Sequence, residues 1–451
     1  MLEAATHDAE RVWPVFVADP ALLEMHAHAP GRTAWFGATL RALDERLREE
    51  GSGLTVLHGR PEQVLSAFAG EVGAERVYAT ADEDPVATAR DRRVAEQVDL
   101  RLIDDQRIVP TSELQTGAGS PYTVYTPFRR ALDERIDGSP QVATARADSD
   151  RSKLAPRPTR ARGPRADDGP TAPHELPPAG EEAATRQLRG FLRGDIDGYR
   201  DDRDRPDLDT TSRLSPYLRV GAISIRACWR AAINASERAR ERNDRRLARG
   251  AATWRGQLAW REFFAHVLAA HPRLATESFR VELDAVEWAA DSDATDAIAA
   301  WRVGRTGFPF VDAGMRQLVA TGWMHNRARL TTASFLVKDA GVDWRRGESV
   351  YLEHLLDADT QQNNGNWQWV AGVGTDAAPY FRIFNPTLQA KKFDPDGAYV
   401  RRWVPELAHL PNALIHEPWR APEPPRGYPP PILDHAEARQ RTLARYRATR
   451  G

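Results

Sequence analysis

The chain has 451 residues, of which 41% are hydrophobic, with 62 Lys and Arg against 64 Asp and Glu, a formal net charge of −2. This length suits two or three domains with sizeable buried cores. The single cysteine, Cys228, excludes an internal disulfide and a cysteine-rich zinc site, and we expect no metal centre. The sequence has no segment apolar enough to span a membrane and no signal-peptide pattern at its start, so we expect a cytoplasmic protein.

The small net charge hides an uneven distribution. Residues 186–451 carry 40 basic and 33 acidic side chains, whereas residues 1–185 carry an excess of acids. Eleven of the thirteen tryptophans also lie from Trp229 onward. A basic half that is rich in large aromatic rings favours contact with a polyanion, although a solvated surface is the alternative.

The first part of the chain alternates between β-branched runs and segments with helical periodicity. Four runs are predicted strands: residues 12–18, 54–58, 76–79 and 100–104. Strands that alternate with helices predict a parallel sheet with crossover helices.

The composition then changes twice. Residues 138–182 are rich in Pro, Arg, Asp and Gly and predict an irregular connector, whose basic run is more typical of a solvated linker than of a nucleic-acid-binding arm. After Glu181 the helical pattern continues almost throughout. We therefore expect an α/β domain over residues 1–130, a linker over 131–185 and a large all-α domain over 186–451.

Residues 357–394 read DADTQQNNGNWQWVAGVGTDAAPYFRIFNPTLQAKKFD. Acids, amides and tryptophans are clustered here without the aliphatic periodicity of a buried helix. Such a cluster suits a planar ligand with polar edges, such as a flavin; a glycine-rich surface loop is the alternative. The segment closely resembles the flavin-binding core of the photolyase/cryptochrome family, most of all the class I photolyases that repair cyclobutane pyrimidine dimers.

The resemblance covers nearly the whole chain and implies FAD as the cofactor. Residues that match the family's FAD site would hold the diphosphate and surround the flavin ring: Tyr199, Thr211, Ser212, Arg213, Leu214, Ser215, Trp254, Arg329, Asp357, Ala358, Asp359 and Asn363. Arg329 would pair with Asp357, and the Asn363 amide would face the flavin N5. Trp288, Trp344 and Trp367 match the tryptophans that relay electrons to the photoexcited flavin.

The resemblance also implies DNA as the partner. A pyrimidine dimer inside a duplex cannot reach a buried flavin, so it must be flipped out, as in other enzymes that carry out chemistry on a base. Trp260 and Trp369 match aromatic walls of the lesion pocket, and Asn326 matches an amide beside the lesion. Residues at matching DNA-contact positions are Arg203, Gln257, Arg261, Arg327 and Gln389. The stretch MHNRARLTTASF lacks the His-x-x-x-His arrangement of six-four photolyases, which favours cyclobutane dimers.

The sequence departs from the family in four places. Family members begin with a strand that is missing here, so the N-terminal sheet should lack its first strand. Gln257 replaces a usual Glu and Leu330 a frequent Met. Ser120 replaces the acid of folate-binding members, which leaves a deazaflavin-type or folate-type second antenna chromophore open.

The resemblance thus predicts a monomeric lyase in which photoexcited reduced FAD transfers an electron to the flipped-out dimer. No side chain is expected to act as a nucleophile. A cryptochrome-type blue-light photoreceptor without repair activity is the main alternative. A non-enzymatic single-strand-binding module is a distant third, because it would not need the cluster of acids and amides.

Overall fold

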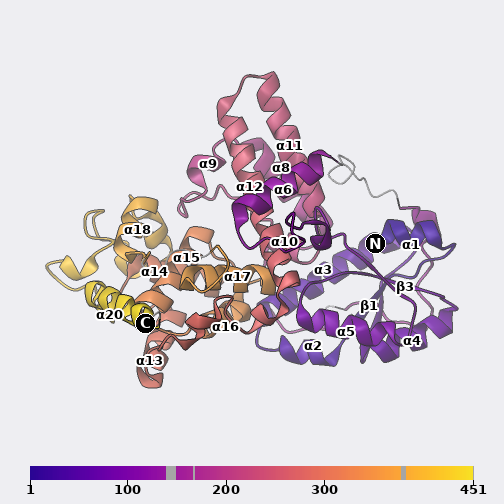
Figure 1. Cartoon of the computed structure of the whole chain (residues 1–451), viewed down its shortest axis with the longest axis horizontal. Helices are drawn as coiled ribbons and strands as arrows, with labels where there is room; N and C mark the ends of the chain where they lie inside the picture. The colour runs from indigo at the N-terminus through magenta and orange to yellow at the C-terminus, as the bar shows by residue number, and fades with distance from the viewer. Residues whose placement is uncertain (139–148, 166–167, 377–381, 450–451) are drawn as a thin grey trace. The chain divides into compact units, whose positions relative to one another are not determined.

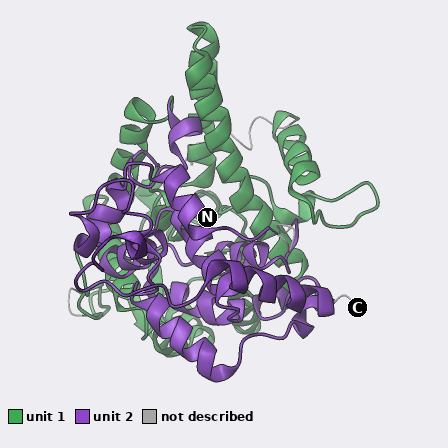
Figure 2. Ribbon diagram, turned by 90° about the vertical axis from the view of Figure 1, so that its left-hand side faces the viewer, with its two compact units in different colours: residues 1–197, 212–272 green, residues 198–211, 273–451 purple. Residues whose placement is uncertain are grey.

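The computed structural model describes residues 1–138, 149–165, 168–376 and 382–449. Parts of the predicted linker and of the 357–394 motif therefore lie outside the described residues. The chain divides into two compact units, which Figure 2 colours separately: unit 1 holds residues 1–197 and 212–272, and unit 2 holds residues 198–211 and 273–451. The helices that follow the connector belong partly to unit 1, so this division differs from the boundaries expected at residues 130 and 185.

Unit 1 contains four short strands, all paired in parallel. They are β1 (Val15–Ala18), β2 (Thr55–His58), β3 (Val77–Thr80) and β4 (Leu100–Ile103). β1 pairs with β2, and β3 pairs with β4. Within the described residues the strands form two sheets of two strands each, instead of one continuous sheet.

Helices cover these strands, and several begin at proline, whose fixed φ suits the first turn. The helices of unit 1 are α1 (Leu2–Asp8), α2 (Pro20–Met25), α3 (Pro30–Glu49), α4 (Pro61–Val72), α5 (Pro85–Ala95), α6 (Tyr125–Asp137), α8 (Glu181–Gly194), α10 (Ser215–Arg219), α11 (Ile225–Glu241) and α12 (Arg245–Ala270). The alternation of these helices with parallel strands confirms the predicted α/β class of the N-terminal region.

The described part of the connector is irregular, as predicted, but it is bound to unit 1. The Trp35 indole donates to the Pro177 carbonyl at 3.0 Å, and the Tyr217 hydroxyl donates to the Pro178 carbonyl at 2.7 Å. Basic side chains of the connector pair with acids, for example Arg151 with Glu50 at 2.7 Å. These contacts favour a packed linker over a nucleic-acid-binding arm.

Helices α11 and α12 run side by side as a long antiparallel pair (Figure 1). Gly250 of α12 permits the close approach of the chain that follows α8. A Cβ atom at Gly250 would lie 1.8 Å from the Ile196 carbonyl oxygen, so no larger residue fits there.

Unit 2 is helical, which confirms the predicted α-helical region. Its helices are α9 (Tyr199–Asp202), α13 (Asp291–Arg302), α14 (Pro309–Thr321), α15 (Asn326–Ser334), α16 (Trp344–His354), α17 (Thr360–Ala371), α18 (Pro386–Phe393), α19 (Ala398–Trp403) and α20 (His435–Ala448). The π-helix η5 (Phe335–Asp339) follows α15 directly. A single large hydrophobic cluster, which includes Trp301, Trp344 and Trp367, packs these helices together.

Helix α20 is fastened to the end of α17 through one backbone carbonyl. The Ala371 carbonyl accepts hydrogen bonds from the Lys338 ammonium at 2.7 Å and from the Tyr446 hydroxyl at 2.6 Å. The Lys338 ammonium also lies 3.9 Å from the centre of the Tyr446 ring. Burial lowers the pKa of Lys338 to about 7, so these contacts hold an amine that is costly to bury.

Candidate functional site

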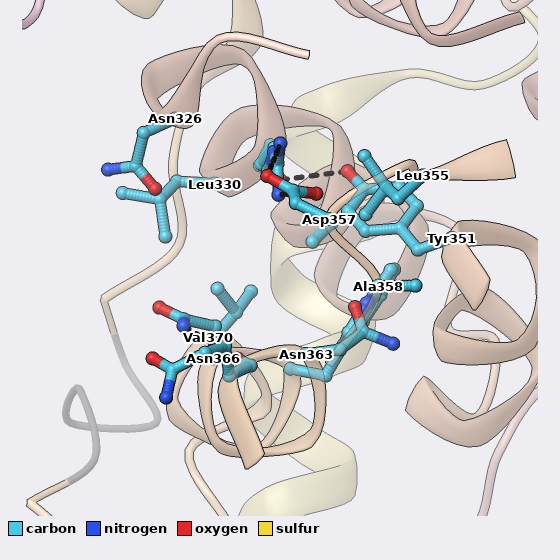
Figure 3. A pocket seen from close by; sticks show the side chains of 13 residues that line it. Asn326, Leu330, Tyr351, Leu355, Asp357, Ala358, Asn363, Asn366 and Val370 are labelled. Carbon is cyan, nitrogen blue, oxygen red and sulfur yellow. Dashed lines mark hydrogen bonds and ion pairs between the residues drawn. The ribbon is translucent and has the colours of Figure 1, made fainter. Parts of the chain in front are cut away.

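A pocket of about 490 Å³, part of it open to solvent, lies among α15, α16 and α17 of unit 2 (Figure 3). Residues from α15, from the end of α16 and from residues 357–370 of the sequence motif converge on it. The predicted site residues that line it are Asn326, Arg329, Asp357, Ala358, Asn363 and Trp367. The structure thus brings together residues that the sequence separates by about 40 positions.

Asp357 and Arg329 form a two-pronged ion pair at this pocket. The Arg329 Nη1 and Nη2 atoms lie 3.1 Å and 2.8 Å from the two Asp357 carboxylate oxygens. The Asp357 side chain is only 4% exposed, and Arg329 Nε donates to the Met324 carbonyl at 2.8 Å. A buried carboxylate needs such a partner to remain charged, so the pair predicted from the sequence is present.

The orientation of the Asn363 amide follows from its partner. Asn363 Nδ2 donates to the Glu348 backbone carbonyl at 3.2 Å. A carbonyl oxygen can only accept, so the amide nitrogen must face Glu348 and the amide oxygen is left for the pocket. In Figure 3 this oxygen lies on the side of Asp357, and the nitrogen turns away. Asn363 therefore presents an acceptor to whatever occupies the pocket.

Asp359 serves a structural role that the resemblance does not include. Its Oδ1 accepts from the backbone N–H groups of Gln361 at 3.0 Å and Gln362 at 3.3 Å, and so caps the start of α17. The cap fixes the first turn of the helix that carries Asn363. The contact of Asp359 with the flavin stays a prediction.

Glu348 lies on α16 behind α17 and is 8% exposed. Burial raises its pKa to about 8, against the opposing effect of the neighbouring Asn364 amide. Its carboxyl group is therefore mostly neutral at neutral pH. A neutral acid at this position adds no second charge to the surroundings of Asp357.

The three predicted relay tryptophans belong to the same hydrophobic region of unit 2. Trp344 and Trp367 are buried in the cluster, and Trp288 packs against it half-buried. The Trp367 ring contacts Tyr351, with ring centres 4.9 Å apart, and Trp301, at 6.2 Å. The relay order Trp288–Trp344–Trp367 stays a prediction.

The predicted diphosphate-binding residues fall on both sides of the division at residue 211. In unit 2, burial raises the pKa of the Tyr199 hydroxyl to about 12. The hydroxyl oxygens of Thr210 and Thr211 are buried and have no hydrogen-bond partner among the described residues. In unit 1, Arg213 adopts φ 48°, a left-handed conformation that is costly for arginine. Ser212, Leu214 and Ser215 follow Thr211 directly and lead into α10.

Four predicted residues lie on α12 of unit 1. Trp254 is 2% exposed and packs against Phe191, with ring centres 5.0 Å apart. Gln257, about one turn further along, and Trp260, nearly two turns along, are half-buried. Arg261, with a side chain only 12% exposed, donates to the carbonyl of Gln106 at 3.3 Å. These internal contacts give Arg261 a structural role beside its predicted phosphate contact.

Two arginines with predicted DNA contacts flank one carboxylate in unit 2. Arg327 Nη2 lies 2.8 Å from Asp204 Oδ1, and Arg203 Nε lies 3.8 Å from the same oxygen. The Arg327 guanidinium also lies over the Phe393 ring at 4.2 Å. Asp204 therefore holds the two positive groups close together before any phosphate arrives.

The remaining predicted DNA residues lie on three helices of unit 2. Asn326 begins α15, Trp369 lies on α17 and Gln389 on α18, and the last two are half-buried. His325 caps α15 by accepting from the Arg327 N–H at 3.1 Å and is 2% exposed.

Sequence reasoning missed several pocket residues: Ala333, Tyr351, Leu355, Gln362, Asn366 and Val370. The spacing of residues along the helices indicates that some of them face the pocket. Gln362, Asn366 and Val370 follow one another at four-residue steps, and therefore share a face of α17. Tyr351 lies seven residues after Trp344, two turns along α16.

Known proteins resemble this chain over almost its full length. Residues 1–147 match DNA photolyase, and residues 254–448 match the FAD binding domain of DNA photolyase. The deoxyribodipyrimidine photo-lyases of Halobacterium salinarum and Escherichia coli are 40% and 36% identical, over 99% of this chain and 93% and 95% of theirs. The chain is a member of the DNA photolyase family.

Solved structures of the family agree with this fold. A bacterial class III photolyase from Agrobacterium tumefaciens matches with a TM-score of 0.87 and 36% identity, over 100% of this chain and 94% of that one. The Synechocystis sp. PCC6803 cryptochrome matches with a TM-score of 0.86 and 26% identity, over 98% and 95%.

The residues present fit the FAD that the family's domain binds. The pocket combines apolar side chains with an acceptor at Asn363 and an ion pair at Asp357, as a flat ring with polar edges requires. The buried, unpartnered hydroxyls of Thr210 and Thr211 are suitable donors for a phosphate oxygen. Among the described residues there is no cluster of three metal-binding side chains and no helix able to cross a membrane.

Proposed function

We propose that this protein repairs cyclobutane pyrimidine dimers in DNA in a light-dependent reaction. The observation that carries the proposal is the pocket formed by Asn326, Arg329, Asp357, Asn363 and Trp367 within an FAD-binding domain. Relatives at 36–40% identity are named deoxyribodipyrimidine photo-lyase, which supports the same activity here.

Bound FAD, in its reduced form, supplies an electron on absorbing blue or near-ultraviolet light. The protein's own residues bind and orient. The Asp357–Arg329 pair places a fixed negative and a fixed positive group at one edge of the pocket. The Asn363 oxygen offers a neutral acceptor, so it can hold an N–H donor without a further negative charge.

The proposed lesion contacts come from aromatic, amide and basic side chains. Trp260 and Trp369 would stack against the unstacked bases, and Asn326 and Gln257 would hydrogen-bond their polar edges. Arg203 and Arg327 would contact phosphates. Gln257 cannot ionise, so it would hold the dimer by hydrogen bonds alone.

A repair assay tests the proposal directly. The purified protein is reduced, incubated with an oligonucleotide that contains one thymine dimer, and assayed with and without blue light. Repair only in the light supports the proposal. Tight flavin binding without repair in either condition would support the photoreceptor, which the similarity to a cryptochrome structure keeps as the second candidate.

Two further proposals concern the class of photolyase and the identity of a second, light-harvesting chromophore. A class I enzyme follows from the sequence motifs, while a class III structure is among the similar ones. An archaeal relative from Sulfolobus tokodaii, 28% identical, holds two FAD molecules, with a light-harvesting role implied for a cofactor. We propose a second chromophore of deazaflavin or folate type here; mass spectrometry of the released cofactors would distinguish the two.

A further inference from the structure

Trp260, the proposed lesion wall on α12, is stacked face to face on Tyr125, the first residue of α6. The two ring centres lie 3.8 Å apart and the ring planes differ by 4°. Both residues belong to unit 1, and both are half-buried, so part of the Trp260 indole remains accessible to solvent. One face of the indole is thereby covered by a second aromatic ring.

A parallel, nearly centred stack is not what two aromatic rings prefer by themselves. Their quadrupoles favour offset or edge-to-face arrangements. The surroundings must therefore impose this geometry. The fully buried Phe263 ring meets both partners edge-on, at 5.6 Å from Trp260 and 5.9 Å from Tyr125, with interplanar angles of 84° and 81°.

The Tyr125 hydroxyl fixes the stack to the backbone of α12. It donates to the Gly256 carbonyl at 2.9 Å. Gly256 lies four residues before Trp260, so its carbonyl is also the regular helical acceptor for the Trp260 N–H. The hydroxyl of Tyr125 is thus bound to the turn of α12 that precedes Trp260, and its ring packs against the Trp260 indole.

We propose that Tyr125 is a positioning residue for lesion recognition, which holds the Trp260 ring in place before the dimer arrives. This inference rests on the proposed function. A ring that is already immobilised loses less conformational freedom when a base stacks on it, so binding is tighter. The alternative is that Tyr125 contributes only to packing between α6 and α12.

The experiment compares variants of the full protein in the dark. The test variant is Tyr125→Leu, which removes the stacked ring, and Tyr125→Phe keeps the ring and removes only the hydroxyl. The matched control is Tyr122→Leu, because Tyr122 lies three residues earlier and its ring packs against Phe128 and His266. The measured quantities are the dissociation constants for an oligonucleotide with one thymine dimer and for the same oligonucleotide without damage.

Tyr125→Leu is expected to reduce the preference for damaged DNA by about three- to tenfold, the cost of ordering one large side chain, with unchanged affinity for undamaged DNA. Tyr125→Phe, which keeps the ring but loses the hydrogen bond to Gly256, should show a smaller loss than Tyr125→Leu. Tyr122→Leu should stay within about twofold of the wild-type preference. In a Trp260→Leu background, Tyr125→Leu should have no further effect, because Tyr125 acts through Trp260. If the leucine variant is less stable to heat, Tyr125→Met, with a larger side chain, takes its place.

An unchanged preference in Tyr125→Leu, or equal losses in Tyr125→Leu and Tyr122→Leu, would overturn the positioning role while leaving the proposed function intact. A full additional loss in the Trp260→Leu background would also overturn it. If the wild-type protein itself binds both oligonucleotides equally, the proposed function fails, and the inference fails with it.

Discussion

Removing Arg329 should destabilise unit 2 strongly, because it leaves Asp357 buried without its partner. In the Arg329→Met variant, the Asp357 carboxylate, whose side chain is 4% exposed, keeps its negative charge. It loses both hydrogen bonds from the Arg329 guanidinium, at 3.1 Å and 2.8 Å. Breaking a buried pair in this way costs roughly 3–5 kcal/mol. For a unit of about 200 residues each kcal/mol lowers Tm by roughly 2–4 °C, so a decrease on the order of 6–20 °C is expected.

The assay is thermal unfolding followed by circular dichroism, with the protein free of FAD, so that loss of the cofactor does not contribute. The control is the double variant Arg329→Met/Asp357→Asn, in which the orphaned charge is also removed. It should recover more than half of the lost Tm, because the penalty arises mainly from the unpaired carboxylate. A single variant that melts with the wild type, or a double variant that is less stable than the single one, would refute this reasoning.

Four further outcomes follow from the site. Trp367→Phe should block the photoreduction of oxidised FAD, followed by absorption, but preserve repair by protein that was reduced beforehand. Loss of both activities would indicate a structural role for Trp367 instead of a role in the electron relay. Burial raises the pKa of Glu348 to about 8, so between pH 5 and 8 this carboxyl group is protonated in the folded protein and ionised in the unfolded chain. The free energy of unfolding should therefore fall as the pH rises from about 5 to 8. Glu348→Gln should flatten that dependence in urea unfolding, and an unchanged slope would contradict it. Gln257→Ala should weaken binding to dimer-containing DNA about tenfold, because the lost hydrogen-bond partner is worth roughly 1–3 kcal/mol. Gln257→Glu should change the repair yield only modestly. If the alanine variant binds and repairs as well as the wild type, the photoreceptor is favoured. Arg203→Ala should weaken binding to damaged and undamaged DNA alike and flatten its salt dependence; a selective effect on damaged DNA would assign Arg203 to lesion reading.

Much of the fold could be predicted because local patterns and tertiary structure agree. The β-branched runs at residues 12–18 and 54–58 became β1 and β2, shorter by a few residues at their starts. The aliphatic spacing after Glu181 became helices. The partition of the chain was harder to foresee. Helix α12 joins unit 1 through contacts with α6 and α11, and such contacts leave no signal in the periodicity of either helix.

In the candidate site, too, some contacts could be predicted from the sequence and others could not. The Arg329–Asp357 pair was predicted because both residues match a motif with a chemical reason for pairing. The contacts of Arg261 with backbone carbonyls and the capping role of Asp359 were not, because each depends on a backbone atom whose position only the fold determines. Tyr125 was missed for a similar reason: it lies 135 positions from Trp260, and no spacing rule connects them.

The shared Ala371 carbonyl gives the last helix of the chain a role in the architecture of the pocket. Helix α17 carries Asn363 and Trp367, and its final turn is held by Lys338 and by Tyr446 of α20. A deletion that removes α20 should therefore free the end of the helix that carries the predicted flavin-site residues Asn363 and Trp367, although α20 itself does not line the pocket.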